Sequence, residues 1–304
     1  MAFTLEPGRP TLRCARRLVL ALGAASLACA SVVPLGNQID VAEESAFIVW
    51  DEAAKIQHFI RRASFRTAAK DFGFLVPTPS VPELKEVSDL AFPLLDRMTR
   101  VERAPLAIPN RSSTPAPPAA APVVVLAQAS VAGYDAAVLE ASDAKALGAW
   151  LKRNGYASSP QLIEWVRPYL ERQWKITAFK ISRNPKSKDQ VDSAAVRMSF
   201  KTDEPYFPYR EPATSGRSQS RQEPRLLRVY LLATSRMEGG LSAPTAWPGR
   251  LVWSDRINEA DRAALLGHVK LPDSTAPGAL WLTKFEDASS PRPGVSDLVF
   301  RRVP

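Results

Sequence analysis

The chain has 304 residues, which suits one large domain or two small ones, and its 45% hydrophobic and 23% charged residues are ordinary for a folded globular protein. Its formal charge of +9 makes only a weak case for binding nucleic acid, and we expect no such partner. Both cysteines, Cys14 and Cys29, stand near the start. The chain that follows them therefore has no disulfide, no thiolate nucleophile and no cysteine-ligated metal centre.

The first 30 residues have the three parts of a secretory signal peptide. Four arginines precede an uncharged apolar run, Leu18–Leu27, and the small-x-small triplet that follows predicts cleavage between Ala30 and Ser31. The apolar run is about half as long as the roughly 20 residues that a membrane-spanning helix needs. We therefore predict export to the periplasm or the exterior, with no transmembrane helix in the mature chain.

Two alternatives concern the export route and its product. Arg16 and Arg17 before Leu18 partly resemble a twin-arginine signal, which exports folded chains. Cys29 is alternatively the lipidated first residue of a lipoprotein, which would anchor the protein to a membrane, although Ser26 stands where such signals carry leucine. Cleavage after Ala30 removes both cysteines, and it lowers the charge to +6 because the leader holds four arginines and one glutamate.

Residues 31–103, the N-terminal half, are predicted to be rich in strands. An apolar run with β-branched and aromatic residues predicts a buried strand, a second run pairs with it, and prolines end a third, since proline cannot donate to a sheet ladder. A helical spacing of leucines follows and contains a proline that weakens it. In chain order these elements are strands at Ala46–Trp50, Lys55–Phe65 and Phe72–Val76, the last ended by Pro77, and a helix within Ser88–Arg100 that contains Pro93.

Two stretches have no regular pattern. Residues 104–122 consist mainly of proline, alanine, serine and threonine, which leave little to bury and favour extended conformations, so we predict a flexible insertion. Residues 211–224 are polar and basic without periodicity, and they predict a mobile surface loop.

Residues 123–304, the C-terminal half, contain more predicted strands than helices, and the strands come in adjacent pairs without strand–helix–strand alternation. This pattern predicts an α+β fold with mainly antiparallel sheet and a few short helices. Whether the two halves form two lobes or one large domain stays open. The expected strands are Val123–Ala129, Tyr134–Glu140, Trp174–Ile181 with one wet face, Ala195–Phe200, Leu226–Ala233, Leu251–Trp253 and Ala279–Phe285, and the expected helices begin at the caps Ser142, Ser159 and Asn258.

Several of these segments together resemble a known family. The matching segments are Asn37-Gln38, Lys70–Pro79, Ser88-Asp89, Leu94–Asp96, Val131–Leu139, Trp150-Leu151, Asn154–Tyr156 and Leu282–Phe285. In these the sequence resembles the bacterial exported family catalogued as domain of unknown function 2330. The resemblance implies an exported protein, and it supplies no activity and no catalytic residues. Many members carry a cysteine-containing segment near the mature start, whereas residues 31–35 here have none.

A search for catalytic or metal-binding motifs leaves no candidate residue. His58 and His268 lie on different predicted elements and form no metal-binding motif, so we expect no metal and no cofactor, with a metal site made of carboxylates alone as the open alternative. The nucleophile elbow of hydrolases and the glycine-rich phosphate loops are absent from the sequence. Acid doublets occur at Glu43-Glu44, Asp51-Glu52 and Glu286-Asp287, but adjacent residues on a strand point to opposite faces and do not form a facing pair. We therefore predict no catalytic residues.

Three residues are candidates for ligand contact. Trp247 precedes Pro248-Gly249 in a predicted loop, and exposed aromatic residues in loops often bind ligands. Arg217 and Arg221 belong to a basic, polar stretch that would suit an anionic polymer or a lipid surface. The predicted partner is therefore an unknown component of the bacterial envelope.

The sequence is compatible with two functions. The first is a non-enzymatic extracytoplasmic binding or structural module, which the missing catalytic motifs favour. The second is a hydrolase that acts on an envelope polymer through carboxylates. The second requires two acidic side chains in one cleft, at least one of them with a raised pKa.

Overall fold

The computed structural model describes residues 31–32, 39–67, 73–100, 124–131, 134–156, 158–181, 195–212, 226–289 and 295–303. The predicted signal peptide, the predicted insertion 104–122 and nearly all of the predicted loop 211–224 lie outside these ranges. In chain order the elements are β1 Ser31–Val32, β2 Ile39–Asp51, β3 Ile56–Thr67, β4 Gly73–Thr78, β5 Glu83–Val87, α1 Ala91–Met98, β6 Val124–Val131, β7 Tyr134–Glu140, α2 Ala144–Arg153, α3 Pro160–Glu171, β8 Lys175–Ile181, β9 Ala195–Lys201, β10 Tyr206–Phe207, β11 Leu226–Ala233, β12 Met237–Leu241, β13 Arg250–Arg256, α4 Glu259–His268, β14 Trp281–Asp287 and β15 Leu298–Arg302.

The largest sheet has seven strands in the order β13-β14-β11-β2-β3-β9-β5. Its neighbours pair antiparallel, apart from β11 and β2, which run parallel with Val229 opposite Ala46. The central strand β2 is buried on both faces, because Phe47 and Val49 belong to one hydrophobic cluster and Ile48 to another. A strand covered on both faces carries a continuous apolar run, which is what the sequence shows there.

Two smaller sheets cover one face of this sheet. One has five strands in the order β1-β4-β8-β7-β6, and the other has three in the order β10-β15-β12. The main core lies between the three sheets and includes Ile48 and Phe59 from the large sheet, Phe74 and Phe179 from the five-stranded sheet, and Phe300 from the three-stranded sheet. Strands from both predicted halves of the chain share the two larger sheets.

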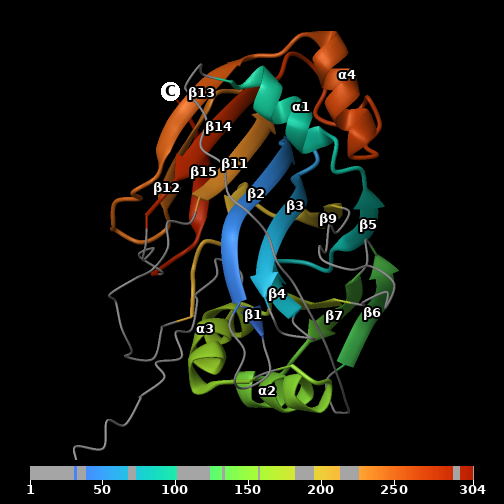
Figure 1. Ribbon diagram of the computed structural model, residues 1–304, viewed down its shortest axis with the longest axis vertical. Coiled ribbons are helices and arrows are strands. Elements are labelled where there is room, and N and C mark those ends of the chain that lie inside the picture. Colours follow the sequence, from blue (N-terminus) through green and yellow to red (C-terminus); the bar gives the residue numbers. More distant parts are fainter. Residues whose placement is uncertain are drawn as a thin grey trace, which may run out of the picture.

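Two pairs of helices cover the outer faces. Helices α1 and α4 pack on the seven-stranded sheet through Phe92, Leu95 and Leu265. Helices α2 and α3 pack on the five-stranded sheet through Leu147 and Trp165. Figure 1 shows the first pair at one end of the molecule and the second pair at the other. The arrangement confirms the predicted α+β class with mainly antiparallel sheet.

The helix caps agree with the sequence in two cases. Ser159 accepts a hydrogen bond from Leu162 N at 3.1 Å, and Asn258 accepts one from Asp261 N at 2.8 Å. The cap of α2 is Asp143 rather than the predicted Ser142, because its carboxylate accepts the bond from Ala146 N at 2.8 Å. An aspartate in this place also favours the positive end of the helix dipole.

Two further predictions about strands are wrong. Strand β4 does not end before Pro77 but continues to Thr78. Among the described residues, β1 pairs with β4 only at Gly73 and Phe74, so no described strand pairs with Pro77 on that side, and the missing N–H costs little there. Strand β8, predicted to have one solvent-exposed face, is buried on both faces at its central residues. The helices cover one side and the large sheet covers the other.

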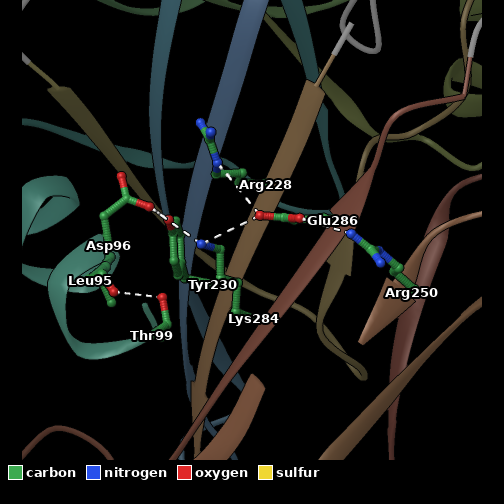
Figure 2. A network of polar contacts seen from close by, with 8 residues as sticks. All are labelled: Leu95, Asp96, Thr99, Arg228, Tyr230, Arg250, Lys284 and Glu286. Carbon is green, nitrogen blue, oxygen red and sulfur yellow. Dashed lines mark hydrogen bonds and ion pairs between the residues drawn. The ribbon is translucent and has the colours of Figure 1, made fainter. Parts of the chain in front are cut away.

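A chain of polar contacts joins α1 to the seven-stranded sheet (Figure 2). The hydroxyl of Tyr230 donates to Asp96 at 2.5 Å, and the ammonium of Lys284 lies 3.4 Å from the same carboxylate. Lys284 is buried and also lies 3.5 Å from Glu286. Glu286 in turn faces Arg228 at 3.8 Å and Arg250 at 3.6 Å, so a single carboxylate is shared by three cations.

The shared carboxylate predicts an unequal effect of two substitutions. Glu286→Gln leaves three neighbouring cations without their common anion, one of them buried, and we expect a loss of about 2 kcal/mol in the free energy of unfolding. Arg250→Gln removes a cation whose side chain is 63% exposed, and we expect less than about 1 kcal/mol. Urea unfolding at neutral pH measures both. Equal losses in the two variants would contradict the shared role of Glu286.

Candidate functional site

An open cleft of about 470 Å³ lies where the three sheets meet. Its volume is within the range of small-molecule binding sites. The lining combines aromatic rings, cations and carboxyl groups from distant parts of the chain. These residues are Lys55, Pro79, Arg172, Trp174, Lys201, Thr202, Asp203, Glu204, Tyr206, Ser242, Asp297 and Val299.

Short connections at the ends of regular elements position the polar side chains. Lys55 lies in the turn between β2 and β3, and Arg172 and Trp174 follow α3. Lys55 and Gln173 have positive φ angles of 55° and 58°. Such backbone is uncommon for residues other than glycine and collects at functional sites. Hydrogen bonds from the backbone N–H groups of Gln173 and Trp174 back to α3 hold this connection in place.

Two aromatic rings form one wall of the cleft. The rings of Trp174 and Tyr206 are 5.2 Å apart between centroids and tilted by 56°. The hydroxyl of Tyr206 donates to the carbonyl of Pro77 at 2.8 Å, and Gln57 bonds both the N–H and the carbonyl of Tyr206. Tyr206 is therefore fixed by the β3 and β4 strands, and the half-buried indole of Trp174 rests against it.

Three cations line the cleft, and the side chains of two of them make no hydrogen bond or ion pair with the described residues. Lys55 donates to the backbone carbonyl of Asp203 at 3.3 Å. Within the described part of the chain, Arg172 and Lys201 make no side-chain hydrogen bond or ion pair, and both are exposed. The negative charge of Glu204 is met by Arg301 at 3.4 Å. The cleft therefore offers two unpaired positive charges to a ligand.

One carboxyl group at the base of the cleft is buried. Asp297 is only 8% exposed, and its Oδ1 accepts hydrogen bonds from the hydroxyl of Tyr169 at 2.8 Å and from Arg210 N at 3.3 Å. Burial raises the pKa of Asp297, although these two hydrogen bonds and nearby arginines act in the opposite direction. Its Oδ2 accepts no hydrogen bond from any described residue. Asp297 is thus an acid that retains its proton more readily than an exposed aspartate.

Of the residues predicted to contact ligand, only Trp247 lies in the described ranges, and it is outside the cleft. It lies in a loop, as predicted, and its ring is half-buried on the main core, 6.4 Å from Tyr209 and 5.7 Å from Phe285 between centroids. A side chain at Gly249 would collide with this ring, which explains the glycine. A ligand role for Trp247 stays a prediction.

The remaining predicted positions are mostly outside the described ranges. Arg217, Arg221 and Ala30 lie outside them, so their roles stay predictions. Ser31, the predicted first residue after cleavage, begins β1 and pairs with Phe74.

The described side chains of the acid doublets make structural contacts, and none of them lines the cleft. Glu44 is buried and lies 2.9 Å from Arg61. Asp51 accepts backbone N–H groups, and Glu52 bonds Arg302 at 2.8 Å. Asp287 accepts the hydroxyl of Tyr209 at 2.6 Å.

The two histidines do not come together. His58 lies in β3 and its Nδ1 is 2.9 Å from the hydroxyl of Ser199, whereas His268 ends α4. Among the residues that the structure covers, no three side chains of histidine, cysteine, aspartate or glutamate are grouped to hold a metal ion. Sequence reasoning missed the doublet Asp203-Glu204, which does line the cleft, and it had no signal for Asp297.

Comparison with known proteins identifies the family. A model of the family described as "uncharacterized protein conserved in bacteria (DUF2330)" matches residues 23–301. The chain belongs to this family. The resemblance seen in its sequence segments is thus confirmed, and the family description assigns no activity. No curated protein sequence matches the chain.

One solved structure is similar over most of its length. The crystal structure of P35 from a baculovirus has 9% sequence identity and a TM-score of 0.38, and the match covers 87% of this chain and 91% of that one. A TM-score this low does not establish a shared fold.

His58 predicts a pH dependence of stability. Burial and the charge of Arg197 lower the pKa of His58 from 6.5 to about 4, against a smaller opposing effect of Asp51. Between these two pH values the unfolded chain binds a proton that the folded chain does not, so stability falls as the pH drops from about 6.5 to about 4. The loss should be on the order of 3 kcal/mol.

The variant His58→Gln keeps a hydrogen-bonding group beside Ser199 and removes this titration. Its free energy of unfolding, measured in urea at several pH values, should fall less steeply than that of the wild type over this window. Parallel curves for the two proteins would show that His58 is not responsible.

Proposed function

We propose that this DUF2330 protein is an exported, non-enzymatic module that binds an acidic saccharide unit of an envelope polymer in the cleft. The unpaired Arg172 and Lys201 carry this proposal. Charged groups that lack protein partners and lie beside aromatic rings suit a ligand that combines an anionic group with a ring.

Each part of the cleft has a role in this proposal. Arg172 and Lys201 bind the carboxylate of the sugar, and Arg172 can do so with two parallel hydrogen bonds. The indole of Trp174 packs against the sugar ring. Tyr206 keeps Trp174 in place, because its own hydroxyl and backbone are already bonded to the fold.

Export rests on the sequence. The N-terminal pattern supports secretion, by the general or the twin-arginine route, with lipid anchoring through Cys29 as the alternative. Within the described ranges no helix is long and apolar enough to cross a membrane. A module outside the cytoplasm would meet anionic wall or surface polymers directly.

A second candidate function is the carboxylate-dependent hydrolase. It is favoured by Asp297, a buried carboxyl group with a raised pKa that lines the same cleft as Asp203 and Glu204. In this reaction Asp297 would protonate the leaving oxygen and a second acid would activate water or attack the sugar. Binding remains the better supported function, because Glu204 is already paired with Arg301.

A single experiment separates the two. Isothermal titration calorimetry with trigalacturonate and with the neutral galactotriose compares an acidic and a neutral ligand of similar size. We expect the wild type to bind the acidic sugar at least about tenfold more tightly, and the double variant Arg172→Gln/Lys201→Gln to lose about tenfold or more of that affinity. Raising the salt concentration should weaken trigalacturonate binding by the wild type more than binding by the double variant.

The matched control is Lys145→Gln/Lys152→Gln, which removes two exposed charges from α2, neither of which lines the cleft. It should bind trigalacturonate as the wild type does. Equal binding of both sugars, or equal losses in both double variants, would refute the proposed binding site. Release of shorter sugars by the wild type but not by Asp297→Asn would overturn the non-enzymatic function in favour of the hydrolase.

A further inference from the structure

A second pocket of about 430 Å³ lies on the five-stranded sheet, away from the cleft. Strands β6, β7 and β8 supply its floor, and the C-terminal end of α2 supplies a wall through Trp150 and Asn154. Small alanines at 129, 136 and 137 leave the floor open. None of the residues of this pocket lines the cleft described above.

The central feature of the pocket is two opposite charges that do not form an ion pair with each other. Asp135 on β7 and Lys180 on β8 are directly opposite in the sheet. Side chains in such positions are close enough to interact. Yet Lys180 donates instead to the carbonyl of Asn154 at 3.4 Å and lies 5.9 Å from the ring of Tyr156. The carboxylate of Asp135 has no hydrogen bond or ion pair with any residue that the structure describes.

The same two strands contain an acid and a lysine that do form an ion pair. Glu140 on β7 and Lys175 on β8 form an ion pair, although the carboxylate of Glu140 is half-exposed. This second pair lies at the other end of the two strands, just beyond the opposed residues Leu139 and Ile176. Burial, and to a smaller extent the charge of Asp135, raises the pKa of Tyr156, which keeps its ring neutral beside Lys180.

The rest of the lining is uncharged. Gln128 and Ser130 on β6 are exposed and make no side-chain hydrogen bond within the described ranges. Asn154 uses its amide N–H to bond the carbonyl of Trp150 at 2.9 Å, and its amide oxygen accepts no hydrogen bond from the described residues. The rings of Trp150 and Tyr156 are only 5% and 8% exposed and stack on each other, so neither offers a free face to a sugar.

We propose that this pocket binds a free amino acid, whose carboxylate is bound by Lys180 and whose ammonium is bound by Asp135. An amino acid has two oppositely charged groups attached to the same carbon atom, and it can fill the gap that the two side chains leave between them. Gln128 and Asn154 flank the ligand with amide groups, and the alanine floor leaves space for a side chain. This site is independent of the saccharide cleft.

The test is calorimetric titration of the full mature chain with leucine, N-acetylleucine and leucinamide. The two derivatives each remove one charge. We expect leucine to bind and each derivative to bind at least about tenfold more weakly, because each leaves one charged group of the pocket without a partner. Asp135→Asn and Lys180→Met should each weaken leucine binding by about tenfold or more.

The control variant is Glu140→Gln/Lys175→Met, which removes the closed ion pair from the same strands and should leave leucine binding unchanged. Thermal unfolding of every variant confirms that it is folded. The proposal is overturned if leucine does not bind at millimolar concentration, if the derivatives bind as well as leucine does, or if Asp135→Asn binds normally. Loss of trigalacturonate binding would not affect it, since that ligand tests the cleft alone.

Discussion

The contacts of the buried Arg61 join the two larger sheets, and the candidate cleft depends on their arrangement. The guanidinium of Arg61 on β3 lies 2.9 Å from Glu44 on β2 and 4.4 Å from the ring centre of Phe74 on β4. Both charges are buried, so each requires the other. Cation and ring therefore connect the seven-stranded sheet to the five-stranded sheet inside the main core.

This connection matters for function because residues from different sheets line the cleft together. Lys55 lies in a turn between two strands of the large sheet and Lys201 ends another of its strands. Trp174 directly precedes a strand of the five-stranded sheet, and Asp297 precedes a strand of the three-stranded sheet. A ligand bound there would contact all three. The pocket around Asp135 and Lys180, in contrast, is built within the five-stranded sheet and its helix α2, and it does not need the other sheets.

Local signals in the sequence predicted the elements well. Continuous apolar runs gave the central strands, and the caps Ser159 and Asn258 fixed the starts of α3 and α4. Short strands such as β5, β12 and β15 were missed, because β5 is mostly exposed and β12 contains two glycines. Their pairing is set by partners far along the chain, which periodicity cannot reveal.

The candidate site was harder to predict for a physical reason. The ring of Trp174 lies 5.2 Å from that of Tyr206 between centroids, and Asp297 accepts a hydrogen bond from Tyr169. Both contacts join residues far apart in the sequence, so they exist only after the sheets have packed. Gly73 shows the same limit. A side chain there would collide with the carbonyl of Phe179, but the sequence alone reveals only a glycine in a strand.

Binding in the cleft is tested most directly by hydrogen exchange of the mature chain with and without polygalacturonate, followed by mass spectrometry. If the acidic polymer binds in the cleft, exchange should slow at residues 172–175 and 201–206, which come from different sheets and meet only there. Slower exchange confined to the basic stretch around Arg217 and Arg221 would contradict the cleft as the binding site and would favour a surface contact with the polymer instead.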